Sequence, residues 1–468
     1  MNFNKKLAVA VSGAVLLMAG QFALADSTTD IVDALVSKGV LTEEEGKLIS
    51  KGHETKKKAE GNIGFKNGFK INSGDGKSNF SVNGRIQSDF RSFNGPDGFG
   101  GSTGNLETAN TFSMRRAYLT AKGTFRNWIN YEATLDGAGS HILKYYWLET
   151  AFSEKFKVRF GQYKMPGSLE QQTSSRFIDF TERDWVTSLA PAVNKGIMIH
   201  GVPTPGLTYA ASVSNGGVLA DTGSGIVQET GSGSDGKAYN VRVTANIAEF
   251  MGNKEAIAHV GGWYGRDSSL PSLTTGVLKF STNAKGTTFF SHTSGLAYQN
   301  PDINRGGLEG IASYGPVKLQ AEWANLELEQ ENIPSRDVTA WYAGASWMIT
   351  GEKYAESYKN GVMDRMSPKN DFTGLGSSGM GAWELGIRYS KFDAKDFVLG
   401  THTTVSASSN DVDSISAGVK WIVDPNTRFL ADYIYTDFNA SILGNSASNR
   451  GVSYSNEKAV NFRAQFDF

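Results

Sequence analysis

The sequence predicts an all-β protein, a transmembrane antiparallel β-barrel of about 16 strands that follows a short N-terminal helical segment. The last nine residues, 460–468, read V-N-F-R-A-Q-F-D-F, with an apolar side chain at every second position up to Phe468. Such a two-residue period suits a strand with lipid on one face and water on the other. Similar short alternating segments, separated by Gly, Asn, Asp and Ser, recur almost throughout the chain. We therefore expect a barrel in the outer membrane of a Gram-negative bacterium.

The N-terminus has the pattern of an export signal. Lys5 and Lys6 precede an apolar stretch at 7–17, and small residues at 23–25 would suit a signal peptidase, so residues 1–25 are predicted to be a signal peptide. A membrane anchor is the alternative, but this stretch is shorter than the roughly 18 residues of a spanning helix, and no later run reaches that length. Any membrane embedding must therefore use strands.

Residues 26–60 differ in composition from the rest and are predicted to form a periplasmic helical segment with a basic linker. Apolar residues recur there at helical spacing, Gly39 would end a first helix, and Thr42 with Glu45 would form a capping box for a second. The linker carries the run 56–58 of three lysines, which is either solvated or in contact with the cell wall or lipid head groups. The helices could also pair between subunits, because two short helices bury little surface alone.

Residues 61–468 are predicted to form the barrel. Polar residues at 83, 85, 87, 89 and 91 alternate with apolar or small ones, as they do at 157–161 and 240–246, and the polar face has one plausible environment, a wet interior. With strands of about 10 residues joined by short turns and some long loops, the roughly 400 residues of this region fit about 16 strands. A barrel of that width leaves an aqueous channel. Glycine-rich stretches at 94–105, 215–236 and 373–382 are expected to be extracellular loops. The polar region from Gln162 to Trp185 is expected to fold into the lumen.

Composition and motifs exclude several function classes. The formal net charge is −1, so no global field indicates nucleic acid as a partner. The absence of cysteine excludes disulfides, thiolate metal sites and covalent haem, and the six histidines show no metal-binding spacing, so no metal or other cofactor is expected. Two G-x-G-x-x-G stretches (231–236 and 374–379) and one G-x-S-x-G stretch (100–104) lie in glycine-rich segments without the flanking strand and helix that such sites need. A barrel lipase remains only a remote alternative, and no catalytic residue is assigned.

An ordered set of short motifs resembles the phosphate-selective porin O and P family. The motifs run from about residue 61 to the C-terminus and cover nearly the whole mature chain. They are Val82-Asn-Gly-Arg85-Ile-Gln, Met114-Arg115-Arg116-Ala-Tyr-Leu, Arg159-Phe-Gly-Gln-Tyr-Lys164, Leu169-Glu170, Thr173-Ser174-Ser175-Arg176, Trp347-Met-Ile-Thr-Gly-Glu352, Gly381-Ala-Trp-Glu-Leu and Gly418-Val-Lys-Trp421.

The resemblance implies a 16-stranded barrel that assembles as a homotrimer and passes small anions, phosphate above all, through a narrow eyelet. The residues that the similarity places at this constriction are Arg85, Arg115, Arg116, Arg159, Lys164, Gln171, Ser174 and Ser175. Arg85 and Arg159 also fall on the polar face by alternation, and a guanidinium forks onto phosphate oxygens in a way that Lys does not. Arg115 and Arg116 are adjacent, so both can face inward only if a bulge interrupts the alternation.

Two departures from the family pattern bear on selectivity. Gln171 stands where phosphate-selective relatives carry Lys, and Glu327, Glu329 and Glu331 occupy a strand that carries lysines in those relatives. Lys164 and Lys144 would offset part of this loss of positive charge. A weakly selective general-diffusion porin for other small solutes therefore stays open beside the anion channel.

The expected partners follow from this setting. They are small anions, outer-membrane lipid and lipopolysaccharide, further copies of the chain, and the barrel-assembly machinery, for which Phe468 and the alternating residues before it would be the sorting signal.

Overall fold

The structure is a computed structural model of the 468-residue chain. It describes residues 32, 35–49, 62–65, 68–95, 98–99, 110–139, 142–216, 236–268, 278–292, 302–376, 378–397, 409–443 and 453–468. The predicted signal peptide, the lysines at 56–58 and most of the predicted loops at 94–105 and 215–236 lie outside these residues. The chain divides into two units, residues 1–64 with 71–79 and residues 65–70 with 80–468.

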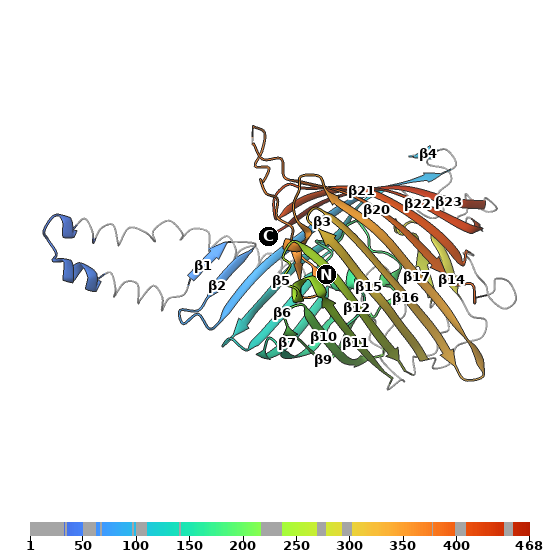
Figure 1. Cartoon of the computed structure of the whole chain (residues 1–468), viewed down its shortest axis with the longest axis horizontal. Coiled ribbons are helices and arrows are strands. Elements are labelled where there is room, and N and C mark those ends of the chain that lie inside the picture. Colours follow the sequence, from blue (N-terminus) through green and yellow to red (C-terminus); the bar gives the residue numbers. More distant parts are fainter. Residues whose placement is uncertain are drawn as a thin grey trace, which may run out of the picture. The chain divides into compact units, whose positions relative to one another are not determined.

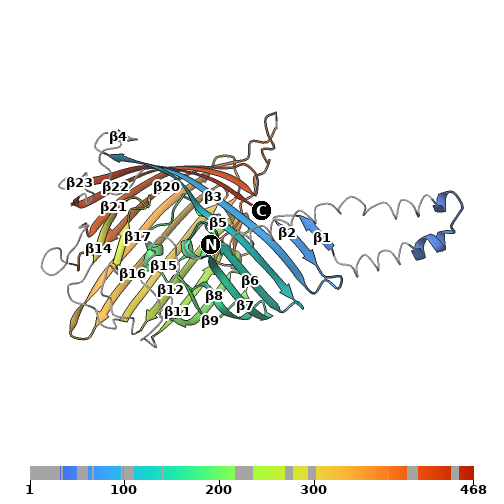
Figure 2. The ribbon, with the colours of Figure 1, turned by 180° about the vertical axis from the view of Figure 1, so that it is seen from behind.

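The second unit is a closed antiparallel barrel of 16 strands, as the sequence predicts, and Figures 1 and 2 show its strongly tilted strands. Each strand pairs with its neighbour in chain order. The barrel strands are β3 (Asn79–Gly95), β5 (Thr111–Phe125), β6 (Ile129–Asp136), β7 (Leu143–Ser153), β8 (Phe156–Lys164), β9 (Val193–Thr204), β10 (Leu207–Asn215), β11 (Lys237–Asn246), β12 (Ala256–Asp267), β15 (Asp302–Tyr314), β16 (Val317–Gln330), β17 (Ile333–Met348), β20 (Ala382–Asp393), β21 (Asp411–Ile422), β22 (Thr427–Leu443) and β23 (Ser453–Asp467).

Among the described residues, the other elements of the structure with assigned bounds are short. They are the strands β1 (Asn62–Phe65), β2 (Phe69–Asn72), β4 (Gly98–Phe99), β13 (Leu278–Ser281), β14 (Thr288–His292), β18 (Tyr358–Lys359) and β19 (Val362–Met363), and the helices α4 (Leu169–Gln172), α5 (Val186–Leu189), α6 (Ile247–Phe250) and η1 (Tyr354–Ser357). In the first unit, residues 43–49 are helical, and the capping box is confirmed because Thr42 N donates to Glu45 at 2.9 Å. Within the described residues, no helix is long and apolar enough to cross a membrane.

The barrel closes where the last strand pairs with the first. Asp467 lies opposite Arg85, and the register runs on to Ala459 opposite Phe93. Phe468 extends this pairing, since its carbonyl accepts from Gly84 N at 2.9 Å and its own N–H donates to Gly84 O at 3.1 Å. A closed ring leaves neither strand with an unpaired edge.

Alternation along the strands agrees with the prediction. On β11, Tyr239, Val241 and Val243 are exposed on the outer face, whereas Arg242 and Thr244 are buried toward the interior. The closing strand follows the same rule: its outward phenylalanines are exposed and its inward polar residues are buried. The outer surface is thus suited to lipid.

The two ends of the barrel differ in their connections. Most of the tight turns, at 126–128, 154–155, 205–206, 315–316 and 423–426, lie at one end, here called the short-turn end, and short turns are typical of the periplasmic end of such barrels. The connection between β17 and β20, residues 349–381, also lies at this end. The prediction of an extracellular loop at 373–382 was therefore wrong, because a glycine-rich composition does not reveal which end of the barrel a connection occupies.

Part of the interior is packed rather than wet. Trp185 next to α5 contacts Phe289 of the β13–β14 hairpin, with ring centroids 5.6 Å apart, and Phe280 of that hairpin lies 4.7 Å from Phe392 on β20. Inward residues of β16 and β17, such as Leu326, belong to the same buried cluster. The expected aqueous lumen is thus limited on the β16–β22 side, where loops fill the barrel.

Candidate functional site

The connection between β8 and β9, residues 165–192, lies inside the barrel and is here called the inner loop. Ser175 of this loop accepts a hydrogen bond from Arg85 on β3 at 2.8 Å. Asp179, farther along, accepts from Lys318 on β16 at 2.7 Å. These contacts with strands far apart around the barrel confirm the prediction that this polar region folds into the lumen.

Four basic side chains gather beside the inner loop: Arg85 on β3, Arg116 on β5, Lys164 at the end of β8, and Arg183 in the loop itself. Lys164 is close enough to the other three to be repelled electrostatically by each of them. Arg85 and Arg116 are buried. These four residues are here called the cation cluster.

The two buried arginines of the cluster have neutral partners. Arg85 donates to the Ser175 hydroxyl and lies 4.2 Å from the ring centroid of Tyr118. Arg116 donates to the side-chain oxygen of Gln87 at 2.9 Å. The Nε atom of Arg85 is buried without a hydrogen-bond partner among the described residues. A guanidinium has five N–H donors, so both side chains retain donors for a solute.

Lys164 and Arg183 are held by main-chain carbonyls of the inner loop. Lys164 donates to the carbonyls of Gln171, Gln172 and Thr173 at 2.7, 3.3 and 3.2 Å. Arg183 donates to the carbonyls of Glu170 at 2.6 Å and Thr173 at 2.8 Å. Within the described part of the chain, no carboxylate lies within ion-pair distance of any cluster member. The cluster therefore carries positive charge that the protein itself does not neutralise at close range.

The inner loop also carries the three neutral residues that the sequence placed at the constriction. Ser175 contacts Arg85 directly, and Ser174 lies next to it, accepting from Arg176 N at 3.4 Å. Gln171, in α4, is half-buried and contributes its carbonyl to Lys164. The side chain of Gln171 thus belongs to a residue whose main chain contacts Lys164 directly.

Arg115 and Arg116 both face inward, so a local irregularity does interrupt the alternation. Arg115 donates to Glu182 of the inner loop at 2.6 Å, while Arg116 reaches Gln87. The regular ladder between β5 and β6 begins only at Tyr118, opposite Asp136, so the two arginines lie outside it.

Arg115 belongs to a second, compensated group of charges. Glu182 also accepts from Arg91 at 2.8 Å, and Arg463 on the closing strand pairs with Asp89 at 2.7 Å. Burial alone would raise the pKa of Glu182, but Arg115 and Arg91 outweigh it and hold this pKa well below its usual value. Three arginines against two carboxylates leave this group weakly positive.

Arg159 differs from the cluster arginines. Its guanidinium donates to Glu149 at 2.6 Å and lies 4.0 Å from the ring centroid of Trp147, while His200 contacts the same carboxylate at 2.8 Å. Lys144 is buried and close enough to Lys164 to repel it. Of the predicted basic residues, Arg85, Arg116 and Lys164 thus lie together, whereas Glu182 balances Arg115 and Glu149 balances Arg159.

The expected carboxylates of β16 are not in the lumen. Leu326 and Leu328 face inward and are fully buried, so Glu327 between them and Glu329 after them face outward, and Glu331 lies exposed in the following turn. The interpretation of these residues as acidic pore lining was wrong. In this part of β16 the apolar side chains point into the barrel and the charged ones point outward, the reverse of the usual arrangement in a porin strand.

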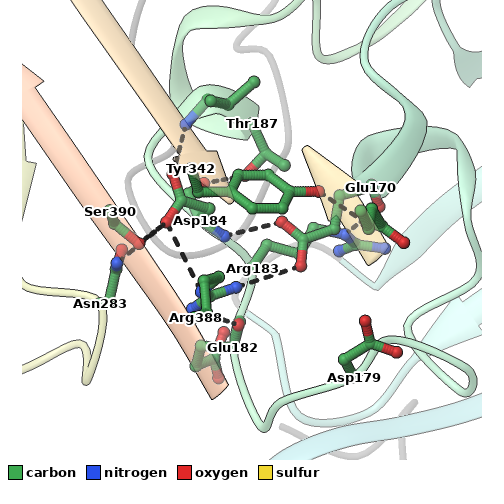
Figure 3. A network of polar contacts seen from close by, with 12 residues as sticks. Glu170, Asp179, Glu182, Arg183, Asp184, Thr187, Asn283, Tyr342, Arg388 and Ser390 are labelled. Atoms are coloured by element: carbon green, nitrogen blue, oxygen red, sulfur yellow. Dashed lines mark hydrogen bonds and ion pairs between the residues drawn. The ribbon is translucent and has the colours of Figure 1, made fainter. Parts of the chain in front are cut away.

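The inner loop is fastened to the far wall by a buried polar network, shown in Figure 3. Arg388 on β20 lies between Glu170, at 3.3 Å, and Asp184, at 3.7 Å. Asp184 also accepts from Asn283 of the β13–β14 hairpin at 3.1 Å, and from Ser390. Burial, with Asp184 acting in the same direction and Arg388 opposing it, raises the pKa of Glu170 to about 7.

The connection at 349–381 also contacts the inner wall. The Tyr358 hydroxyl lies 2.7 Å from Nδ1 of His259 on β12. The Gly361 carbonyl accepts a hydrogen bond from Arg242 on β11 at 2.8 Å. Both wall residues contact Glu309, so one carboxylate supports both attachments. This connection therefore narrows the lumen from the short-turn end.

Sequence reasoning missed Arg183 and the pairing of Arg115 with Glu182 in the compensated group. Arg183 lies at the end of the region predicted to enter the lumen, in the sequence Thr181-Glu182-Arg183-Asp184. The usable signal was a basic residue within a polar region that the sequence predicts to enter the lumen. In the structure the carboxylates point to other partners.

Comparisons with known proteins agree with this fold. The family described as phosphate-selective porin O and P matches residues 80–468. Porin O of Pseudomonas aeruginosa is 26% identical over 403 residues, which cover 80% of this chain and 86% of the relative.

Solved structures of porins align with most of this chain at low sequence identity. OprB of Pseudomonas putida is 10% identical, with a TM-score of 0.50 and coverage of 83% of this chain and 94% of that one. An anion-selective porin from Comamonas acidovorans is 14% identical, with a TM-score of 0.45 and coverage of 84% and 100%. Because the family match spans the whole barrel, the chain belongs to the phosphate-selective porin O and P family and is an outer-membrane channel of a Gram-negative bacterium rather than an enzyme.

Proposed function

We propose that this porin forms a water-filled channel through which small anions diffuse passively, with phosphate and related oxyanions preferred. The observation that carries the proposal is the cation cluster, whose four basic groups have hydroxyl, amide and carbonyl partners. Buried charge without a counter-charge is costly, so an anion that enters the cluster is stabilised by all four groups together. Arg85 and Arg116 would supply directed donors and Lys164 a nearby point charge.

Family membership supports the same solute class. The family that the chain belongs to is described as phosphate-selective porins. Its Pseudomonas aeruginosa relative is named Porin O. The serines at 174 and 175 would add hydroxyl donors to an oxyanion beside the arginines.

A weakly selective general-diffusion porin is the second candidate. Gln171 brings no charge to the cluster, and Glu149 balances Arg159. Both observations reduce the positive charge along the route relative to what the sequence motifs imply.

The reversal potential of a planar bilayer in a salt gradient tests the proposal. We expect the purified channel to prefer chloride over potassium, and inorganic phosphate to block the chloride current. A reversal potential near zero without phosphate block would favour the general-diffusion channel instead.

We further propose that the mature chain, from residue 26 onward, works as a homotrimer in a bilayer of lipid and lipopolysaccharide, inserted by the barrel-assembly machinery, with residues 26–60 in the periplasm. The exposed apolar outer face supports lipid contact. An SDS-resistant trimer that dissociates on heating is expected on gels, and a heat-insensitive monomer would contradict this assembly.

A further inference from the structure

A pocket of about 460 Å³ adjoins the cation cluster on the inner wall formed by β6 to β11. Its lining includes the aromatic residues Tyr145, Trp147 and Tyr163, and it extends to Asn360 in the connection at 349–381. A volume above about 300 Å³ is typical of sites for organic molecules and exceeds what a tetrahedral oxyanion fills. This space is here called the vestibule pocket.

The charged groups around the vestibule pocket are mostly paired. Arg159 and His200 share Glu149, and Lys157 donates to Glu154 at 2.7 Å. Paired groups add little net field, but they offer both donors and acceptors to hydroxyl groups. With the aromatic rings, they form a surface for a hydroxylated ring rather than for a bare anion.

The vestibule pocket and the cation cluster share residues. Lys164 lines the pocket and belongs to the cluster. Tyr145, also in the lining, is close enough to Arg85 and Arg183 to interact with them electrostatically. A solute can therefore reach the cluster and the pocket at the same time.

We infer that the cluster and the vestibule pocket form one composite site for phosphate monoesters that carry a hydroxylated ring, such as sugar phosphates. The phosphate group binds at the cation cluster, and the ring lies against Trp147 and Tyr163 among the paired charges. This inference rests on the proposed function, because it assigns the phosphate end to the anion site, and it extends that function from inorganic to organic phosphate.

Block of the chloride current through the purified full-length channel tests the composite site, with inorganic phosphate, glucose 6-phosphate and glucose as probes. We expect glucose 6-phosphate to reach half-block at a concentration at least about fivefold lower than inorganic phosphate, a factor that corresponds to about 1 kcal/mol of extra contact. Trp147→Ala should remove this difference and leave the inorganic phosphate block unchanged. Trp147→Phe should restore most of it.

Trp323→Ala provides a matched control, because Trp323 is exposed on the outer face of β16. Half-block at equal concentrations of ester and inorganic phosphate would overturn the composite site, as would an ester preference that survives in Trp147→Ala. Block by glucose as strong as that by its phosphate would overturn it too, since the phosphate end would then contribute nothing. If inorganic phosphate does not block and anions are not preferred, the proposed function itself fails; phosphate block without ester preference removes only this inference.

Discussion

Arg85 donates a hydrogen bond of 2.8 Å to the hydroxyl of Ser175 and so joins the first barrel strand to the inner loop at the cation cluster. Arg85→Ala removes a buried charge that no nearby carboxylate balances. We expect the concentration of phosphate for half-block to rise about tenfold, the result of losing about 1.4 kcal/mol of attraction. Titration of the chloride current with phosphate measures this change.

Two further variants separate charge from structure. Arg85→Lys keeps the charge, so its phosphate concentration for half-block should lie between those of the parent and Arg85→Ala. Arg159→Ala removes an arginine that Glu149 already balances, so its effect on phosphate block should be much smaller. An equal effect of Arg85→Ala and Arg159→Ala would contradict the distinction between clustered and paired arginines.

Gln171→Lys should make phosphate block the channel at lower concentration than in the parent. Two unit charges about 4 Å apart at an effective dielectric near 20 interact by roughly 4 kcal/mol before desolvation and screening. Even a quarter of that energy changes anion occupancy several-fold. Gln171→Glu should move the block in the opposite direction, and identical curves for the three proteins would show that this side chain does not face the solute.

The attachment of the inner loop should weaken as the pH rises. The pKa of Glu170 is raised to about 7, so the folded protein favours the protonated carboxyl. The corresponding stabilisation is fully present below the ordinary carboxyl pKa of about 4.5 and is lost as the pH passes 7. We expect current fluctuations to be several-fold more frequent at pH 8 than at pH 5.

Glu170→Gln provides the control for this pH dependence. The amide stays neutral, so the variant should fluctuate at nearly the same frequency at both pH values. Asp184, whose pKa burial also raises, faces Glu170 and can leave a residual dependence. A parent protein with constant fluctuation frequency between pH 5 and pH 8 would refute the role of Glu170.

Phe468 should be required for barrel assembly. Its backbone pairs with Gly84, and its ring lies so close to Gly84 that a Cβ atom added there would be 2.2 Å from it. Deletion of Phe468 should lower the level of the protein in the outer membrane and expose the chain to periplasmic proteases. Gly84→Leu, which competes for the space of the ring, should show the same defect more weakly, and unchanged outer-membrane levels in both variants would argue against this assembly signal.

The periodic parts of the fold could be predicted from sequence because each strand carries its own two-residue signal. Arg85 and Arg242 face inward as alternation requires, and the closing strand has its aromatic residues outside. The direction of Leu326 and Glu327 could not be predicted in this way. Their orientation depends on packing against a hairpin that comes earlier in the sequence, and a local period carries no information about such a contact.

The site was predictable only in part for the same reason. Motifs identified the cluster residues Arg85, Arg116 and Lys164, together with Ser175. They did not show that Glu149 would balance Arg159, because that pairing depends on the register between β7 and β8. Strand register and loop contacts, rather than residue type, decide which arginines keep an unbalanced charge.

The apolar packing between the β13–β14 hairpin and the inner wall links assembly to solute passage. An open sheet would present Leu326 and Phe392 to water until the hairpin arrived with Phe280 and Phe289. The sheet therefore gains its full stability only when the β13–β14 hairpin is packed against its inner face. A substitution such as Phe289→Ala would be observed first as poor surface expression, and only the molecules that escaped degradation would reveal any change in conductance.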